Sequence, residues 1–258
     1  MKEIFEKFFW ILKVQFGLDF RRMARSIGGV PRYLADWRNF RNDYNGQLDL
    51  RPCLHDWYEE GGSTKDEYFW QDLHVARQIH LRGPGKHVDI GSRIDGFVAH
   101  VASFREIEVF DIRPVSTAIP GVRFRQADLT NLSEPHVSCC DSLSCLHALE
   151  HFGLGRYGDP VDPRGYITGL ANMARMLRSG GVFYLSVPIG KERVEFNAHR
   201  VFDPLKLVSL AGENSLLLSA FAWIEPNQAL VQSGEPGRDM EGLSKANYAL
   251  GIFTFTKQ

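Results

Sequence analysis

Acidic side chains stand at the carboxyl ends of three successive predicted strands. Asp89, Asp111 and Asp128 each close a short apolar run that has the length of a buried strand. The carboxyl ends of parallel strands meet at one edge of a sheet, and ligands bind beyond that edge. A carboxylate there accepts hydrogen bonds from both hydroxyls of a ribose. The three acids therefore predict a site for an adenosine-bearing ligand, with Asp111 on the ribose and with Asp128 and Leu129 on the adenine.

The turn after the first of these strands departs from an ordinary cofactor loop. Residues 87–97 read HVDIGSRIDGF, so Arg93 and Asp95 stand where a glycine-rich loop would carry further glycines. The GxGxxG pattern of dinucleotide sites is absent. Three interpretations stay open. Arg93 binds the carboxylate of the cofactor, or it faces a phosphate of another nucleotide, or the loop no longer holds a ligand.

A histidine-rich segment near the same edge has the residue types for proton transfer. His147, Glu150 and His151 follow the predicted strand at 140–146, and His199 follows a later strand. A histidine titrates near neutral pH and can take the proton of a hydroxyl, while a neighbouring carboxylate orients the ring. The segment also spells HxxEH, a zinc-protease pattern. Its place at a strand end favours proton transfer without a metal, and the structural alternative is that these side chains tie the loop to backbone groups.

Polar residues suited to hold an acceptor lie in a turn-rich insertion and in a later basic segment. The insertion spans residues 153–166, and its glycines and prolines are typical of a lid or a binding loop. A solvated connection without a ligand is the alternative. The candidate acceptor-binding residues are Arg156, Tyr157, Asp159, Lys191 and Arg200. Positive charge nearby would suit a nucleotide-sugar or uronic-acid acceptor.

Strands and helices alternate over residues 81–258. This alternation predicts an α/β fold with a doubly wound, mostly parallel sheet and right-handed crossovers. The last two apolar runs, 216–225 and 248–257, have no helix-length segment between them, so we expect an antiparallel pair at the sheet edge. Residues 1–80 are the predicted N-terminal helical extension and linker, and residues 81–258 are the predicted α/β domain.

Residues 1–41 differ in composition from the rest of the chain. Phenylalanines recur there at helical spacing, and nine Lys or Arg against four Asp or Glu leave a net charge of +5. Three interpretations stay open: an extension that packs on the main domain, a helix on an anionic membrane surface, or contact with an acidic acceptor or a second subunit, as in a homo-oligomer.

Composition excludes several classes of function. The chain has 258 residues, 44% of them hydrophobic, and a net charge of -1, which argues against a nucleic-acid partner. Its apolar runs are shorter than the ~18 residues of a membrane span. The four cysteines form no CxxC pair, and reduced thiols fit a cytoplasmic protein.

Five segments resemble the class I S-adenosylmethionine-dependent methyltransferases in their order along the chain. They are DIG, FDIRP, QADL, LHALEHF and LRSGGVFYLSV, and the resemblance covers roughly residues 80–258. It implies a seven-stranded sheet whose last strand is antiparallel, with S-adenosylmethionine as cofactor. It places Gly91 and the adjoining Ser92 beside the methionine part of the cofactor, and Ser144 and Cys145 beside the methyl group.

A narrower resemblance concerns two longer blocks, DIGSRIDGF and LSVPIGKERVEFNAHRVF. Both are similar to a methyltransferase-like family of unknown function that is often found with bacterial surface-polysaccharide genes. The expected activity is therefore O-methylation of a sugar, nucleotide-sugar or glycan acceptor. Two alternatives stay open: a non-catalytic scaffold of a polysaccharide-assembly complex, and an enzyme that uses another nucleotide at the same site.

Overall fold

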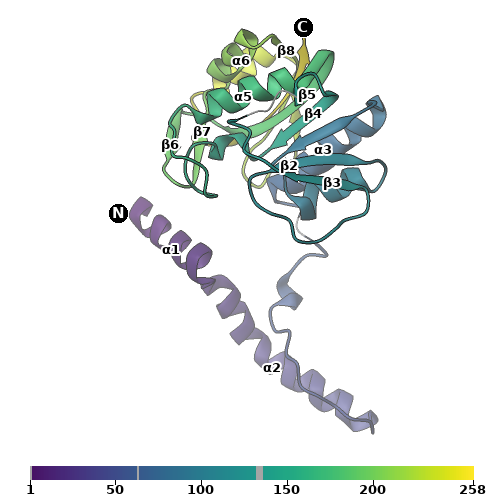
Figure 1. The fold of residues 1–258 in the computed structure, drawn as a ribbon. Helices are drawn as coiled ribbons and strands as arrows, with labels where there is room; N and C mark the ends of the chain where they lie inside the picture. Colours follow the sequence, from purple (N-terminus) through teal and green to yellow (C-terminus); the bar gives the residue numbers. More distant parts are fainter. Residues whose placement is uncertain (1, 63, 132–135) are drawn as a thin grey trace. The chain divides into compact units, whose positions relative to one another are not determined.

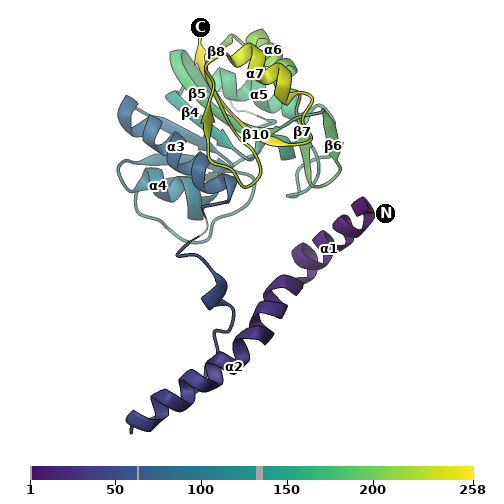
Figure 2. The ribbon, with the colours of Figure 1, turned by 180° about the vertical axis from the view of Figure 1, so that it is seen from behind.

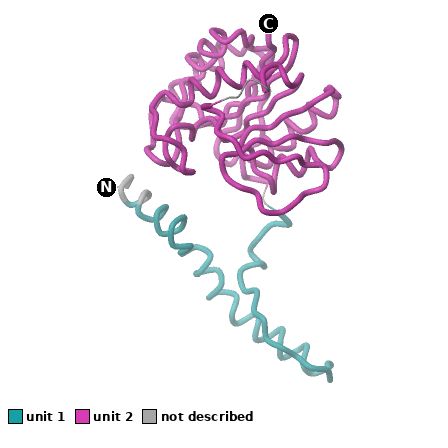
Figure 3. Tube along the Cα trace, in the orientation of Figure 1, with its two compact units in different colours: residues 1–63 teal, residues 64–258 magenta. Residues whose placement is uncertain are grey.

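The computed structural model describes residues 2–62, 64–131 and 136–258. The chain divides into two compact units, residues 1–63 and 64–258, which Figure 3 shows in two colours. The second unit begins earlier than the boundary expected after residue 80, because helix α3, Glu67–Arg82, belongs to it. Val75 and Ile79 of this helix are fully buried in a core that also contains strand residues.

The second unit contains one large sheet (Figure 1). Its eight strands have the order β3-β2-β1-β4-β5-β10-β8-β9. Strands β3, β2, β1, β4 and β5 are mutually parallel, whereas β10 is antiparallel to both β5 and β8. The strands are β1 (His87–Ile90), β2 (Ile107–Asp111), β3 (Val122–Gln126), β4 (Cys140–Leu146), β5 (Leu177–Ile189), β8 (Leu216–Ile224), β9 (Val231–Gln232) and β10 (Ala249–Lys257).

This topology confirms the predicted α/β class and the antiparallel last strand. The expected seven strands are present, and the two-residue strand β9 adds an eighth at the edge. The last two long strands form the expected antiparallel pair at this end of the sheet: β10 lies between β5 and β8, and only the two-residue β9 lies outside β8. The chain order reverses between β1 and β4, and the crevice beyond the carboxyl ends of these strands is where a doubly wound sheet binds ligands.

Helices cover both faces of the sheet (Figure 2). One core contains α3 and the short α4, Ala99–Ala102, packed on the strands through residues such as Val98 and Val101. The other core contains α5, Gly165–Met176, α6, Pro204–Glu213, and α7, Pro236–Leu243. Asp66 caps α3 and Asp203 caps α6, each by accepting hydrogen bonds from backbone N–H groups of the first turn.

Local structure differs from the sequence expectation in three places. The sequence pattern after the first strand predicts a helix over residues 96–104, but the structure has a π-helical turn, Ile94–Val98, followed by the four-residue α4. The segment after β5 forms a hairpin of β6, Arg193–Glu195, and β7, His199–Val201, which the pattern did not predict. Helix α7 was not predicted either, because it has only eight residues and contains two glycines.

The first unit consists of two helices and a returning segment. Helix α1 spans Lys2–Phe16, and α2 spans Phe20–Asp43 with Asp19 as its N-cap. A 3-10 turn, Asp56–Tyr58, lies in the returning segment. In the part of the chain that the structure describes, no helix is both long and apolar enough to cross a membrane.

Candidate functional site

A cavity of about 600 Å³ lies at the carboxyl ends of the central strands. This volume lies in the range of small-molecule sites. Most of the residues predicted for the site line it together: Gly91, Ser92, Arg93, Asp111, Asp128, Leu129, His147, Glu150, His151, Arg156, Tyr157, Asp159 and His199. The tertiary structure therefore brings the adenosine-binding candidates and the proton-transfer candidates into one cavity.

Five predicted site residues do not line the cavity. Asp89, Ser144 and Cys145 are fully buried beneath it. Lys191 is exposed on the surface outside it. Arg200 is buried and directs its guanidinium to backbone carbonyls of the loop above the sheet, Phe152 O at 2.5 Å among them. An arginine held in this way orders the loop and is not available to an acceptor.

The entry turn is built on Asp89 and Gly91. Asp89 accepts hydrogen bonds from the backbone N–H of Ser92 at 3.0 Å, from its hydroxyl at 2.6 Å, and from the Ser144 hydroxyl at 2.5 Å. Burial raises the pKa of Asp89 to about 6 in spite of these bonds. Gly91 has φ +69°, and a Cβ there would lie 2.9 Å from the Cβ of Ala148. Asp89 thus fixes the turn, and glycine at position 91 permits both the positive φ and the close approach of Ala148.

Asp111 faces the cavity but is already paired. Arg113 donates from Nε to Oδ1 at 3.0 Å and from Nη2 to Oδ2 at 2.6 Å, a bidentate ion pair. The Arg113 side chain is 44% exposed, so solvent can solvate it if the pair opens. A ribose that used both oxygens of Asp111 would have to replace this guanidinium.

Arg93 leaves the middle of the cavity open. It donates from Nε and Nη2 to the carboxylate of Asp95 at 3.1 and 2.8 Å, and its guanidinium lies 5.2 Å from the ring centre of Tyr68. Asp95 is exposed on its side chain, so this pair lies at the rim. The arginine in the entry turn therefore does not fill the crevice.

Asp128 and Leu129 follow β3 at the far side of the cavity. Asp128 Oδ1 accepts from the backbone N–H and the hydroxyl of Thr130, both at 2.8 Å, which fixes the carboxylate. Leu129 is buried, and its carbonyl accepts from the Asn172 amide at 2.9 Å. The pair offers an acceptor and an apolar surface side by side, as adenine recognition requires.

His147 is held between two carboxylates. Its Nδ1 lies 2.9 Å from Glu150 Oε1, and its Nε2 lies 3.3 Å from Glu67 Oε1. Burial alone would lower the pKa of His147, but the hydrogen bonds to Glu150 and Glu67 raise it to about 9. Tyr68 stacks on the ring at a centroid distance of 4.5 Å. His147 is therefore an imidazolium at neutral pH and does not serve as a base.

His151 has the opposite electrostatic environment. Its Nδ1 lies 2.7 Å from the carbonyl oxygen of Ala198, so this nitrogen carries the proton and donates it. Burial lowers the pKa of His151, and the neutral ring then has a free lone pair on Nε2. Nε2 lies 3.7 Å from Glu150 Oε1, too far for a hydrogen bond. Of the two histidines of the HxxEH segment, this is the one suited to accept a proton.

His199 and the turn-rich insertion complete the cavity wall. Burial lowers the pKa of His199, whose Nε2 is 3.7 Å from Glu195 Oε2. In the insertion, the guanidinium of Arg156 lies 5.1 Å from the ring centre of Tyr157 and donates to Ala198 O at 2.8 Å. Asp159 accepts from backbone N–H groups at 3.2 Å and thereby shapes the loop.

Sequence reasoning missed several polar contributors to the cavity: Arg113 and Thr130 near the strand ends, and three residues from other segments. Glu67 and Tyr68 begin helix α3, a segment that was assigned to the extension, and Tyr248 precedes the last strand. Tyr248 donates to Glu67 Oε1 at 2.7 Å. The hydrogen bond to His147 lowers the pKa of Glu67 against the raising effect of burial. No local pattern marks these residues, because they meet only through the packing of α3 against the sheet.

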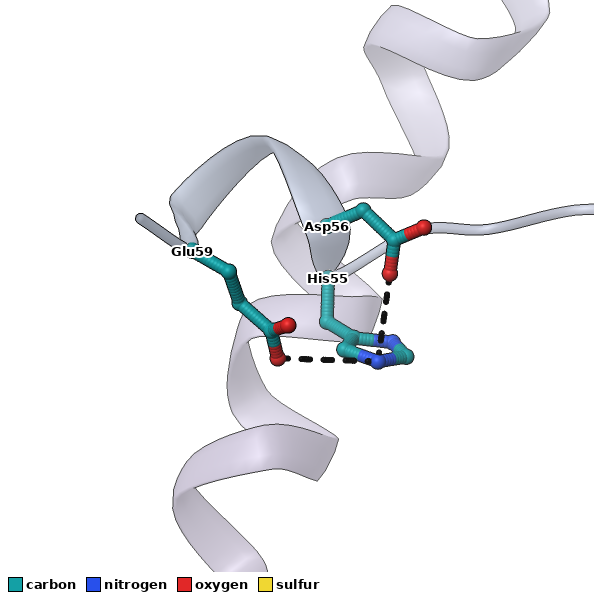
Figure 4. Close-up of side chains that lie close together, drawn as sticks. All are labelled: His55, Asp56 and Glu59. Atoms are coloured by element: carbon teal, nitrogen blue, oxygen red, sulfur yellow. Dashed lines mark ion pairs between the residues drawn. The ribbon is translucent and has the colours of Figure 1, made fainter. Parts of the chain in front are cut away.

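One group with metal-ligand chemistry lies in the first unit (Figure 4). His55, Asp56 and Glu59 bring their ligand atoms within 4.8 Å of one another. Asp56 and Glu59 both pair with Nε2 of His55, and Arg22 donates a hydrogen bond from its Nε to that nitrogen at 3.0 Å. The Nε2 lone pair that a metal would need is therefore already engaged. The two acids are also exposed. We assign no metal to this group.

Part of the chain matches a described family. The model for "Caenorhabditis protein of unknown function, DUF268" matches residues 122–233, which run from β3 to β9. No curated protein matches the sequence. The match contains His147, Glu150, His151 and His199 but neither Asp89 nor Asp111.

Solved structures show the fold. A proposed sarcosine dimethylglycine methyltransferase from Galdieria sulphuraria is 14% identical with a TM-score of 0.52, over 72% of this chain and 85% of that chain. The cyclase SpnF is 14% identical with a TM-score of 0.51, over 71% of this chain and 80% of that chain. The chain thus shares the class I methyltransferase fold, and since one neighbour is named as a cyclase, the fold does not fix the reaction.

Proposed function

We propose that this protein transfers a methyl group from S-adenosylmethionine to a hydroxyl of a sugar or polysaccharide precursor. One observation carries the proposal: Gly91, Asp111 and Asp128 open onto the same cavity as a neutral histidine, His151. The cavity is large enough for a nucleoside and an adjoining acceptor. The sugar acceptor rests on the resemblance of two sequence blocks to proteins of polysaccharide gene clusters.

The residues at the strand ends fit the cofactor. Asp111 would accept from the ribose hydroxyls after Arg113 moves aside, Asp128 would accept from the adenine amino group, and Leu129 would pack on the ring. Gly91, which lines the cavity, would lie beside the methionine part. When bound, S-adenosylmethionine supplies an electrophilic methyl carbon on a sulfonium.

His151 would act as the base. Its Nε2 takes the proton of the acceptor hydroxyl while the oxygen forms its bond to the methyl carbon and the carbon–sulfur bond breaks. The products are the methyl ether, S-adenosylhomocysteine and a proton on His151. The imidazolium of His147 is held by Glu150 and Glu67 and stays charged throughout, so it is a positioning residue for the segment that carries His151.

A non-catalytic scaffold is the second candidate, and one observation favours it. Arg113 engages both carboxylate oxygens of Asp111, so the group that would hold a ribose has an internal partner. In a protein that no longer binds the cofactor, such a pair would neutralise the charge of Asp111. An enzyme that uses a phosphate-bearing nucleotide is the third alternative, with Arg93 and Arg113 as anion ligands.

Calorimetry on the full chain tests these candidates. We expect S-adenosylmethionine and S-adenosylhomocysteine to bind, and Asp111→Asn to weaken binding at least tenfold, since hydrogen bonds to a charged acceptor contribute roughly 1.5–3 kcal/mol. Glu106→Gln is the matched control, because Glu106 precedes the opposite end of the same strand and pairs with the exposed Arg123. Absence of binding would favour the scaffold, and binding of ATP or a nucleotide-sugar alone would favour the third alternative.

A further inference from the structure

Helix α2 carries an apolar stripe that its own unit leaves exposed. The stripe consists of residues at alternating three- and four-residue spacing, which places them on one helix face. Its members are Phe20, Met23, Ile27, Val30 and Leu34, with exposed fractions from 38% at Val30 to 71% at Ile27. Exposed apolar stripes of this length on a helix mark an interaction surface.

The returning segment after α2 runs back along the helix, as the tube in Figure 3 shows. Arg22 donates to His55 Nε2, and Arg32 lies 3.1 Å from the ring centre of Trp57. Arg22 and Arg32 are five positions to either side of Ile27, which is about 140° around the helix. The segment therefore covers the basic face, whereas every member of the stripe stays at least 38% exposed.

Helix α1 extends the apolar surface with aromatic rings. Phe5, Phe8, Trp10 and Phe16 are each more than half exposed. Phe9 packs edge-on against Phe20 at a centroid distance of 5.5 Å, so the aromatic surface of α1 continues into the stripe of α2. Phenylalanine and tryptophan are the side chains that insert at the boundary between lipid headgroups and acyl chains.

The charge pattern favours an anionic lipid surface over a second copy of the helix. Residues 2–43 contain nine Lys or Arg and five Asp or Glu, a net charge of +4. A coiled coil places opposite charges beside its apolar stripe. Here the flanking positions hold Ala24, Ser26, Pro31 and Tyr33, and none is acidic. Repulsion between two cationic helices would oppose pairing, whereas anionic lipids attract each cation.

We propose that α1 and the stripe of α2 dock on an anionic membrane surface. The helices would lie in the plane of the interface, with the aromatic and aliphatic side chains buried in the lipid. Arg38 and Arg41, which are exposed and follow Leu34 at +4 and +7 on the same side of the helix, would lie toward the headgroups. The surface and the cavity have no residue in common, so the inference does not depend on the proposed methyl transfer.

Vesicle flotation of the full-length protein tests the inference. We expect the protein to float with vesicles that contain phosphatidylserine and not with pure phosphatidylcholine vesicles, and to dissociate as salt is raised, because salt screens the attraction. Failure to bind phosphatidylserine vesicles, or equal binding to both kinds, would overturn the proposal.

Single substitutions separate the lipid surface from other occupants. Ile27→Ser and Phe8→Ser should each weaken vesicle binding about tenfold, because each removes a buried apolar side chain from the lipid. Val161→Ser is the control, since Val161 is 68% exposed in the second unit, and its binding should match the unsubstituted protein. Circular dichroism establishes that each variant is folded.

Two outcomes would identify a different partner for the stripe. If Ile27→Ser converts a dimer into a monomer in light scattering without vesicles, the occupant is a second copy of the chain. If it lowers the melting temperature of the second unit, the occupant is that unit. Either result overturns the membrane surface.

Discussion

The two ends of the cavity hold their charges in different ways. At the strand end, Asp111 pairs with Arg113, whose side chain is 44% exposed. At the other end, Glu150 and His147 pair while both are almost fully buried, with side-chain exposures of 1% and 7%. Water can solvate the guanidinium of Arg113 when a ligand takes its place on Asp111. His147 is buried, so moving it away would leave the carboxylates of Glu150 and Glu67 buried without a positive partner. The Asp111–Arg113 pair can therefore open for a ligand, whereas the Glu150–His147 pair stays formed.

The largest expected effect comes from breaking the buried pair. Glu150→Ala leaves the charged His147 with only one carboxylate, so we expect a loss of about 3–5 kcal/mol in the free energy of unfolding, measured by urea denaturation. The exposed pair Glu106–Arg123 is the matched contrast. Glu106→Ala should change stability little. Equal losses in the two variants would mean that burial does not distinguish the pairs.

The protonation of His147 should appear in the pH dependence of stability. Its folded pKa is about 9, above the ordinary value of 6.5, so folding favours the protonated form. The contribution, about 3 kcal/mol, is fully present below pH 6.5 and is lost as the pH rises through 9. Denaturation measured between pH 6 and pH 10 should show this loss in the unsubstituted protein and not in His147→Asn. A flat profile would contradict the raised pKa.

Removing the proposed base should affect turnover alone. His151→Ala should lower methyl transfer roughly a hundredfold and leave the affinity for S-adenosylhomocysteine unchanged. In the unsubstituted protein, turnover should fall as the pH drops through the lowered pKa of His151, because the protonated ring cannot accept a proton. Normal turnover in His151→Ala would transfer the role of base to His199.

The smallest expected effect concerns the Asp111–Arg113 pair. Arg113→Gln removes the internal partner of Asp111, so S-adenosylhomocysteine should bind about threefold more tightly, as a gain of about 0.7 kcal/mol in calorimetry. Arg123→Gln, which changes an exposed arginine outside the cavity, is the control. Weaker binding in Arg113→Gln would show that the guanidinium contacts the ligand instead of competing with it.

Much of the fold followed from local patterns. The strands over 87–90 and 140–146 have the predicted bounds, because each is a short apolar run between turn signals. The hairpin of β6 and β7 could not be predicted, since its strands have three residues each and are partly polar. Helix α3 was recognised as a helix but placed outside the domain, because an amphipathic pattern does not say which core the apolar face joins.

The candidate site, like the fold, was only partly predictable from the sequence. Residue type and order along the chain placed Asp111, Asp128 and the histidines at one edge, because parallel strands end there. The sequence could not separate His147 from His151, since both stand in one short segment with Glu150 between them. Their opposite pKa shifts depend on Glu67, which is distant in the chain and helps to raise the pKa of His147, and on the burial that lowers the pKa of His151.

What residue order determined, then, is the sheet and the edge at which its acids gather, since alternating apolar runs have few ways to pack. What the tertiary structure decided is the charge state of each group at that edge. Arg113 pairs with Asp111, and α3 brings Glu67 to His147. Ala198, just before β7, supplies the backbone carbonyl that fixes the tautomer of His151. Protonation depends on burial and on neighbours within a few ångströms, and those neighbours come from remote segments that only folding brings together.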